Sequence, residues 1–210
     1  MSFCAFGQEP TNHGSAPVSN SFFRWQAPAV AVEVLGSSAF SRLSAYAQFG
    51  KLRLTGATVR SEGHSFQQIT TGWVFAPLKS EETEFFIEPF VGSALTREGS
   101  RLAAGGRFVY LSKNWFLENW TTKYGGHNGW TNCEPLMDVM RHVGKGFYVG
   151  AASSCYVGTE HHEEKAERHA HFFAGPGMLY RRGNLDVGAS YEFQLRGNQK
   201  FWAVFGTYTF

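Results

Sequence analysis

The chain has 210 residues, of which 16% are aromatic, 17% are charged and 24 are glycine. A typical soluble domain carries roughly 25% charged residues, so this composition is poor in charge and rich in rings and glycine. The mean hydropathy is −0.26. No run reaches the roughly 18 consecutive apolar residues of a membrane-spanning helix, which excludes a helical membrane protein. The formal charge of +2 is too balanced for a nucleic-acid binder, which gathers basic residues on one face. The length fits one domain.

The first seven residues end in Ala5-x-Gly7, the small-x-small pattern that closes a secretory signal peptide. The basic and apolar regions that should precede this pattern are missing. We therefore interpret residues 1–7 as a remnant of a longer signal, with a chance match in a disordered N-terminus as the alternative. Residues 8–27 are polar and aperiodic and predict a flexible segment, which leaves 28–210 for the folded domain.

Alternation of apolar with polar or small residues dominates the chain after the N-terminal segment. The clearest case is 185–196, where every second residue from Leu185 to Leu195 is apolar or aromatic. A strand places such a set on one face, whereas a helix does not. Similar segments, separated by polar breaks that contain glycine, lie at 29–36, 42–60, 65–78, 83–97, 101–112, 115–124, 147–157, 170–181 and 201–210. The pattern fades in 125–144, where we expect a short helix over 134–142 with Pro135 in its first turn.

These segments predict an all-β fold, a single antiparallel up-and-down β-barrel of eight to ten strands. Closure into a barrel removes the two exposed edges of such a sheet. Alternation alone does not distinguish a soluble barrel, which is apolar inside, from a transmembrane barrel, which is apolar outside. The polar face carries Gly, Ser and charges of both signs, which suit the narrow lumen of a small transmembrane barrel. We prefer that interpretation to a soluble, secreted, lipocalin-like barrel that binds a ligand.

The end of the chain carries a more specific signal. Counting back in steps of two from the final residue gives Phe210, Tyr208, Gly206, Val204 and Trp202. This pattern resembles the C-terminal signature of bacterial outer-membrane β-barrel proteins. The resemblance implies that the barrel-assembly machinery reads Trp202, Val204, Tyr208 and Phe210. It also implies a monomer in the bacterial outer membrane, in contact with membrane lipid and lipopolysaccharide.

The same resemblance implies an orientation, because the last strand of such barrels runs down to the periplasm. Counting strands back from the C-terminus then puts the 196–200 turn and the 159–167 loop on the outer side, and the 182–184 turn on the periplasmic side. The most charged loop would thus lie outside, as expected for barrels with long outer loops and short periplasmic turns.

Charged residues of both signs fall on the polar face of the predicted strands. The candidates for a polar cluster in the lumen are Glu84, Glu88, Arg101, Arg107, Arg181, Asp186, Glu192 and Arg196. Pairing across strands would neutralise these charges, and side chains should fill most of the lumen of an eight- to ten-stranded barrel. We therefore expect a closed plug rather than a polar passage with a charge-selective constriction. The expected role is non-enzymatic: envelope integrity, surface binding or narrow passage of small solutes.

The segment 160–171 holds four His and four Glu residues. Imidazole and carboxylate groups bind divalent metals, which makes His161, His162, His169 and His171 candidate ligands. Their spacing matches no defined metal motif, and a solvated, charge-balanced outer loop is the preferred interpretation. We therefore expect no cofactor.

An outer-membrane lipid-modifying enzyme, which cleaves or transfers acyl chains of lipid A, is the enzymatic alternative. Such chemistry uses His and Ser with an acidic partner, and His64-Ser65 and His127 place these residue types in breaks between strands. The sequence contains no nucleophile-elbow, phosphate-loop or dinucleotide motif. Cys133 and Cys155 could pair in an exported chain, but their spacing leaves this open.

Overall fold

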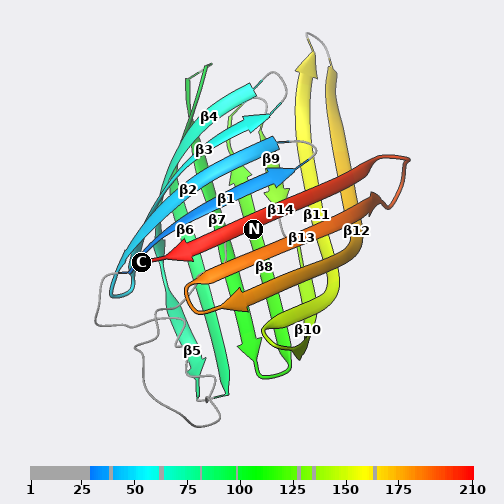
Figure 1. The fold of residues 1–210 in the computed structure, drawn as a ribbon. Helices are drawn as coiled ribbons and strands as arrows, with labels where there is room; N and C mark the ends of the chain where they lie inside the picture. Colours follow the sequence, from blue (N-terminus) through cyan, green and yellow to red (C-terminus); the bar gives the residue numbers. More distant parts are fainter. Residues whose placement is uncertain are drawn as a thin grey trace.

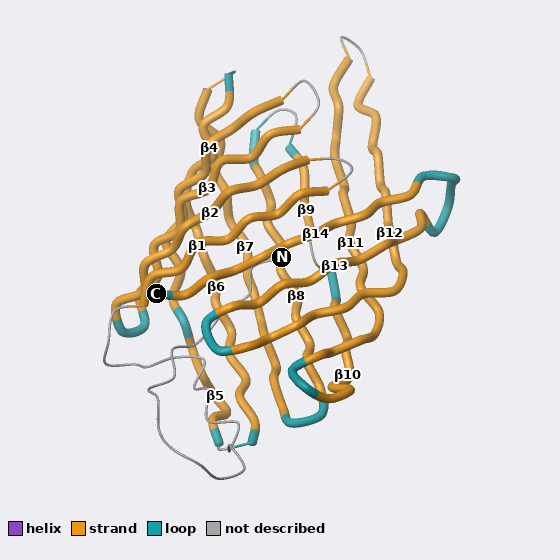
Figure 2. Tube along the Cα trace, in the orientation of Figure 1, coloured by secondary structure: helices purple, strands orange, loops and turns teal. Residues whose placement is uncertain are grey.

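The computed structural model describes residues 29–37, 40–61, 64–80, 82–97, 99–126, 129–133, 136–162 and 165–210. The predicted signal remnant and flexible segment, residues 1–27, lie outside these ranges. Every regular element within them is a strand (Figure 1, Figure 2). The strands are β1 (Ala29–Ser37), β2 (Phe40–Phe49), β3 (Leu52–Ser61), β4 (His64–Trp73), β5 (Phe75–Lys79), β6 (Thr83–Thr96), β7 (Gly99–Ser112), β8 (Trp115–Tyr124), β9 (Trp130–Cys133), β10 (Asp138–Gly144), β11 (Phe147–His162), β12 (Lys165–Arg182), β13 (Leu185–Gln194) and β14 (Lys200–Thr209). No helix long and apolar enough to cross a membrane is present among the described residues.

The sheet closes on itself. Consecutive strands pair antiparallel around the whole circumference, and β1 pairs with both β2 and β14. Two barrel strands are each built from two segments: β4 and β5 lie end to end beside β6, and β9 and β10 lie end to end between β8 and β11. The structure is therefore a closed, antiparallel, twelve-stranded barrel, which confirms the predicted fold class.

The predicted count of eight to ten strands is too low for two physical reasons. First, 42–60 reads as one alternating segment but is two strands, because the chain reverses at Gly50, which adopts a positive φ of 59°. Glycine reaches this conformation without steric cost. Second, most of 130–144 is strand, which adds β9 and β10 to the wall.

The helix expected over 134–142 is wrong. Residues 134 and 135 lie outside the description, but β10 begins at Asp138 and alternates normally, with Asp138 and Met140 buried. A carboxylate and a thioether share the inner face here, so apolar character does not alternate along the strand. The period-two signal is lost although the strand is present.

Proline explains a break in the ladder on β12. Pro176 pairs with Ala151 of β11, but the pairing of β12 with β13 passes from Ala174–Phe193 directly to Gly177–Ser190. Proline has no N–H to donate, which accounts for the incomplete ladder at this position.

The barrel has two distinct ends. The start of β1 and the end of β14 meet at one of them, which we call the terminal end, where the Phe210 amide donates a hydrogen bond to the Val30 carbonyl at 2.8 Å. The short turns at 50–51, 113–114 and 183–184 also lie there. The opposite, or loop, end carries the 195–199 connection and the tip of the β11–β12 hairpin, which stands above the neighbouring strands in Figure 1.

The predicted 159–167 loop is largely the tip of this hairpin. Register pairs continue from Thr159–Arg168 to His162–Lys165. The charges of this segment therefore belong to a paired ribbon that extends past the rest of the wall, rather than to an irregular loop.

Candidate functional site: the charged interior of the barrel

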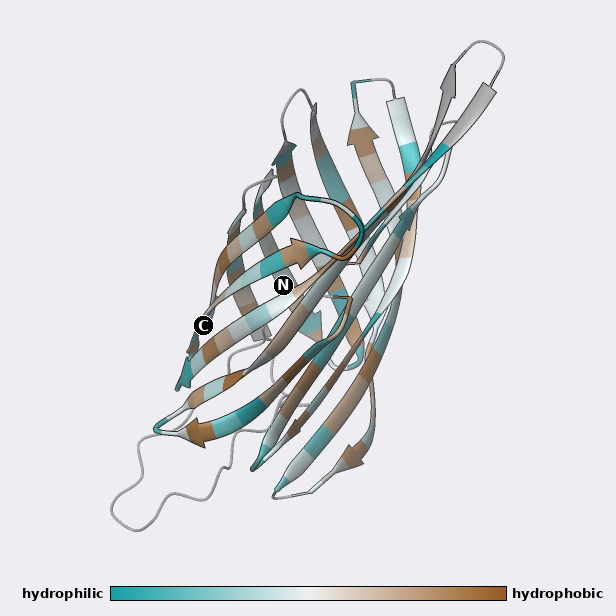
Figure 3. Ribbon diagram, turned by 90° about the vertical axis from the view of Figure 1, so that its right-hand side faces the viewer, coloured by the Kyte–Doolittle hydropathy of each residue, from teal (hydrophilic) through white to brown (hydrophobic). Residues whose placement is uncertain are grey.

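Strand alternation gives the barrel an apolar outer surface and a polar interior. On β13, Leu185 and Val187 are exposed on the outside, whereas Asp186 and Ser190 are buried inside. Hydrophobic and hydrophilic residues also alternate along other strands, seen as brown and teal segments in Figure 3.

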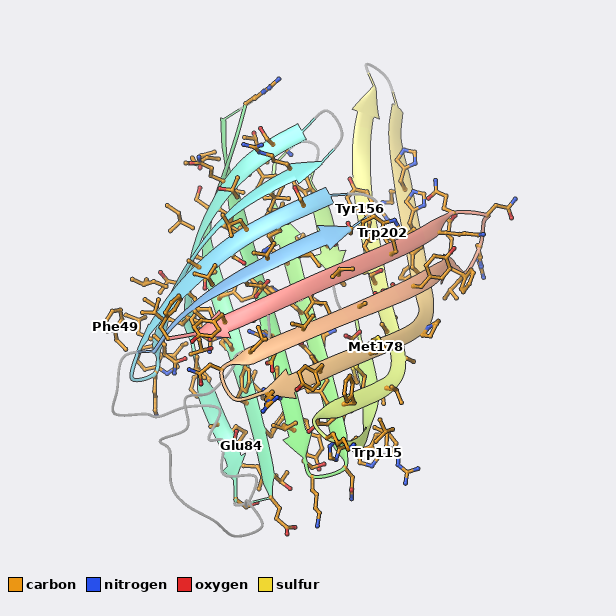
Figure 4. All side chains as sticks on the ribbon, viewed as in Figure 1. Phe49, Glu84, Trp115, Tyr156, Met178 and Trp202 are labelled. Atoms are coloured by element: carbon orange, nitrogen blue, oxygen red, sulfur yellow. The ribbon has the colours of Figure 1, made fainter. Side chains whose placement is uncertain are left out.

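Large apolar side chains cover the outside of the wall. Exposed examples come from eight strands: Val34, Leu43, Leu54, Ile69, Val91, Leu102, Met178 and Val204. Figure 4 shows Met178 on β12 and Trp202 on β14 among the side chains on this surface. Soluble proteins rarely expose an apolar surface this extensive, whereas a transmembrane barrel requires one. The lipocalin-like alternative needs a polar exterior and does not fit.

The first interior ion pair joins β3 to β6. Arg53 donates a hydrogen bond from Nη1 to Oε2 of Glu88 at 2.6 Å, and from Nη2 to Oε1 of Gln48 at 2.9 Å. β4 lies between the two paired strands and contributes Gly72, at which an added Cβ would overlap the Glu88 carboxylate. The glycine therefore provides the space in which the ion pair forms.

A second pair joins β7 to β8. Arg107 donates to Oε1 of Glu118 from Nε at 2.8 Å, and its Nη2 lies 2.7 Å from the same oxygen. The guanidinium also lies 5.5 Å from the ring centroid of Trp120 and 5.7 Å from that of Phe86. Ring faces stabilise a cation, so Arg107 is held from several directions.

Other interior charges lie nearer the ends. Arg181 and Asp186 pair at 3.0 Å close to the terminal end. Toward the loop end, Glu192 accepts hydrogen bonds from Ser154 at 2.5 Å and from Ser190 at 2.8 Å. Glu192 is thus bound by neutral hydroxyls, in contrast to the three ion-paired carboxylates.

Two contacts reach across the interior between strands that are not neighbours. The Arg42 guanidinium of β2 lies 4.1 Å from the centroid of the Trp120 ring of β8. The Tyr124 hydroxyl of β8 donates a hydrogen bond to Oε1 of Gln68 on β4 at 2.8 Å. These contacts narrow the interior in its middle and near the loop end.

Apolar side chains fill much of the remaining interior. A buried cluster draws residues from strands all around the wall, among them Leu35, Phe86, Phe116, Leu179 and Phe205. Glycine again makes room, since a Cβ added at Gly188 would overlap the Phe205 ring. The interior is therefore narrow and mixed in polarity, and its charged side chains lie among buried apolar side chains.

No protein-family model matches the chain, and no curated protein matches its sequence. Among solved structures, the KdgM porin in complex with disordered oligogalacturonate aligns with a TM-score of 0.55 at 10% identity, covering 87% of this chain and 99% of that porin. The NanC porin aligns with a TM-score of 0.55 at 8% identity, covering 85% of this chain and 98% of that porin.

The chain has the fold of an outer-membrane porin. Together with the apolar outer band, this porin fold confirms the predicted outer-membrane β-barrel. The C-terminal residues named by the resemblance all point outward: Trp202, Val204, Tyr208 and Phe210 are exposed. Their recognition by an assembly machinery stays a prediction.

Most of the predicted lumen cluster lies inside the porin fold. Glu88, Arg107, Asp186 and Glu192 are buried, Arg101 and Arg181 are partly buried, and Glu84 lies on the inner face at the start of β6. Arg196 is the exception. The chain turns at Leu195, before Arg196, so this side chain is exposed in the 195–199 connection.

Among the described residues, five charged side chains that face the interior were not predicted from the sequence: Glu33, Arg42, Arg53, Glu118 and Asp138. The first four alternate with apolar or neutral neighbours that face outward, as Arg53 does between Leu52 and Leu54. Assigning the inner and outer faces of every predicted strand from its alternation would have identified these four residues. Asp138 had no such signal because it was assigned to a helix.

The four candidate metal ligands lie on the β11–β12 hairpin. His171 is hydrogen-bonded through Nδ1 to Nε2 of Gln194 at 2.8 Å, and His169 is partly buried. The side chains of His161 and His162 lie outside the described residues. Within the described part of the chain, no group of three or more His, Cys, Asp or Glu side chains is placed to hold a metal.

The enzymatic alternative depends on His64-Ser65 and His127. His64 is the first residue of β4 and its side chain is outside the description, as is the whole of His127. The prediction of a catalytic His therefore stays untested.

Proposed function

We propose that this chain is a monomeric outer-membrane barrel that allows narrow passage of small polar solutes. The observation that carries the proposal is the charged interior, and in particular the carboxylate oxygens that lie buried there without a protein partner. Both side-chain oxygens of Asp138, Oε2 of Glu118 and Oε1 of Glu33 have no hydrogen-bond partner among the described residues.

An unpaired carboxylate in a dry, apolar core costs several kcal/mol. A plug that only closes the barrel gains nothing from such groups, and apolar side chains of similar volume would be at least as stable. Unsatisfied interior carboxylates are instead favourable where water or a polar solute reaches them. The arrangement therefore supports a hydrated path rather than the closed plug expected from the sequence.

The solved porins support passage as the role of this fold, and the KdgM porin was solved with an oligogalacturonate. The interior here carries a different balance of charge. Seven carboxylates (Glu33, Glu84, Glu88, Glu118, Asp138, Asp186 and Glu192) and five arginines (Arg42, Arg53, Arg101, Arg107 and Arg181) face inward on the described strands. This balance favours neutral or cationic solutes over polyanionic saccharides.

Assembly and orientation complete the proposal. The outward aromatic residues of β14 act as the signal for the barrel-assembly machinery, and the terminal end faces the periplasm. The loop end, with the charged β11–β12 tip, faces outward beside lipopolysaccharide.

Conductance in planar lipid bilayers tests the proposed passage. We expect steady, small current steps from the purified protein and larger steps from Arg42→Ala, because that variant removes the contact that crosses the interior to Trp120. Arg60→Ala is the matched control, since Arg60 is exposed on the outer face of β3. It should leave the step size unchanged.

The absence of steps from both the wild type and Arg42→Ala would contradict the proposal, provided that the protein shows the heat-modifiable gel migration of a folded barrel. Acyl release or transfer from lipid A that is lost in His64→Ala or His127→Ala would instead establish the enzymatic alternative.

A further inference from the structure

Two carboxylates face each other directly inside the barrel. Glu118 of β8 and Asp138 of β10 are register partners, and both side chains are 0% exposed. Side chains directly opposite on adjacent antiparallel strands have Cβ atoms roughly 5 Å apart, and like charges in this relation repel. An arrangement of this kind persists where a positive charge, or a proton shared between the two carboxyl groups, compensates it.

The protein supplies part of that charge. Arg107 binds Oε1 of Glu118, which leaves Oε2 of Glu118 and both oxygens of Asp138 without a hydrogen-bond partner among the described residues. The backbone of Ser153 makes a minor favourable contribution to the Asp138 carboxylate. Two negative charges thus share one guanidinium, and three buried carboxylate oxygens remain available.

Two further carboxylates also act on this pair. Glu33 acts electrostatically on Glu118, and Glu192 acts on Asp138. Two other interior arginines have partners of their own, since Arg53 pairs with Glu88 and the Arg42 guanidinium lies over Trp120. One further positive charge would neutralise the facing pair.

We propose that Glu118 and Asp138 bind a small cation that takes oxygen ligands, and that this site makes the passage cation-selective. Carboxylate oxygens are the ligands that such hard cations prefer, and acidic side chains in a constriction select cations. The selectivity rests on the proposed passage, whereas the binding site itself does not.

The reversal potential in a KCl gradient measures the selectivity. We expect the wild type to prefer K⁺ over Cl⁻, and Asp138→Asn to reduce the permeability ratio about threefold or more, because it removes one charge while preserving shape. Asp186→Asn is the matched control: it makes the same change of charge beside the 183–184 turn at the terminal end, away from the facing pair, and should change the ratio less. Anion preference in the wild type, or equal effects of the two variants, would overturn the selectivity.

Ca²⁺-dependent unfolding in detergent tests the site without any current. A ligand that binds only the folded state raises the unfolding temperature, so Ca²⁺ should stabilise the wild type and Asp186→Asn but not Asp138→Asn. If Ca²⁺ stabilises all three proteins equally or none of them, the cation site is refuted. If the selective stabilisation occurs in a protein that passes no current, the proposed passage fails and the cation site stands.

Discussion

Glycine residues on the inner face determine which large side chains the barrel can hold. Gly72 admits the Arg53–Glu88 pair and Gly188 admits the Phe205 ring, each by lacking the one carbon that would overlap its neighbour. In the sequence these residues look the same as the turn glycines. Each of these glycines makes space for a large side chain on another strand, so its role depends on the register between the strands.

Gly188→Ala tests this packing. The added methyl group must displace the Phe205 ring inside a packed interior, which costs about 1–3 kcal/mol. Urea unfolding of the refolded protein in detergent measures the loss. Gly56→Ala is the control, since no atom lies within 4 Å of a Cβ at that position, and it should change stability little. Equal effects of the two variants would show that the interior is not packed as described.

At the scale of elements, β9 and β10 together form one strand of the wall in two pieces. β9 has four residues and ends at Cys133, which is the register partner of Cys155 on β11. Both thiols are buried, and they lie within hydrogen-bonding reach of each other. Beyond the junction, Leu136 and Met137 are hydrogen-bonded to Ser153 of β11.

We expect mild oxidation to join Cys133 and Cys155, with two electrons and two protons passing from the thiols to the oxidant. Of the three cysteines in the full chain, one thiol should then remain titratable in denaturant. The cross-link would stabilise the barrel by about 3 kcal/mol, seen as a higher unfolding temperature. Cys133→Ser is the control and should show no oxidation-dependent change. Three free thiols after oxidation would refute the pairing.

For the whole molecule, the terminal end carries the two-residue turn at 183–184, the loop end carries the longer 195–199 connection, and the proposed orientation puts the loop end outside the cell. Asn198 lies in the 195–199 connection at the loop end, and Asn184 lies in a two-residue turn at the terminal end. Both are exposed or partly exposed, so the same substitution can report on either side of the membrane.

We expect a membrane-impermeant maleimide to label Asn198→Cys but not Asn184→Cys on intact cells, each in a background with the three native cysteines replaced by Ser. Lysed cells should label at both positions, which controls for accessibility. The reverse labelling pattern would invert the proposed orientation.

The sequence determined the fold class and which residues face lipid, because both are local properties. Alternation with period two can be seen within a single segment such as 185–196, and the outward aromatic residues of β14 also lie within one segment. Only the tertiary structure decided the strand number, the partners of the charges and the shape of the interior. Arg53 meets Glu88 across an intervening strand, Arg42 reaches Trp120 from the far side, and Asp138 faces Glu118. These contacts exist because the closed wall and its register bring distant segments to one level of the lumen, and the spacing of residues within one strand does not encode that closure.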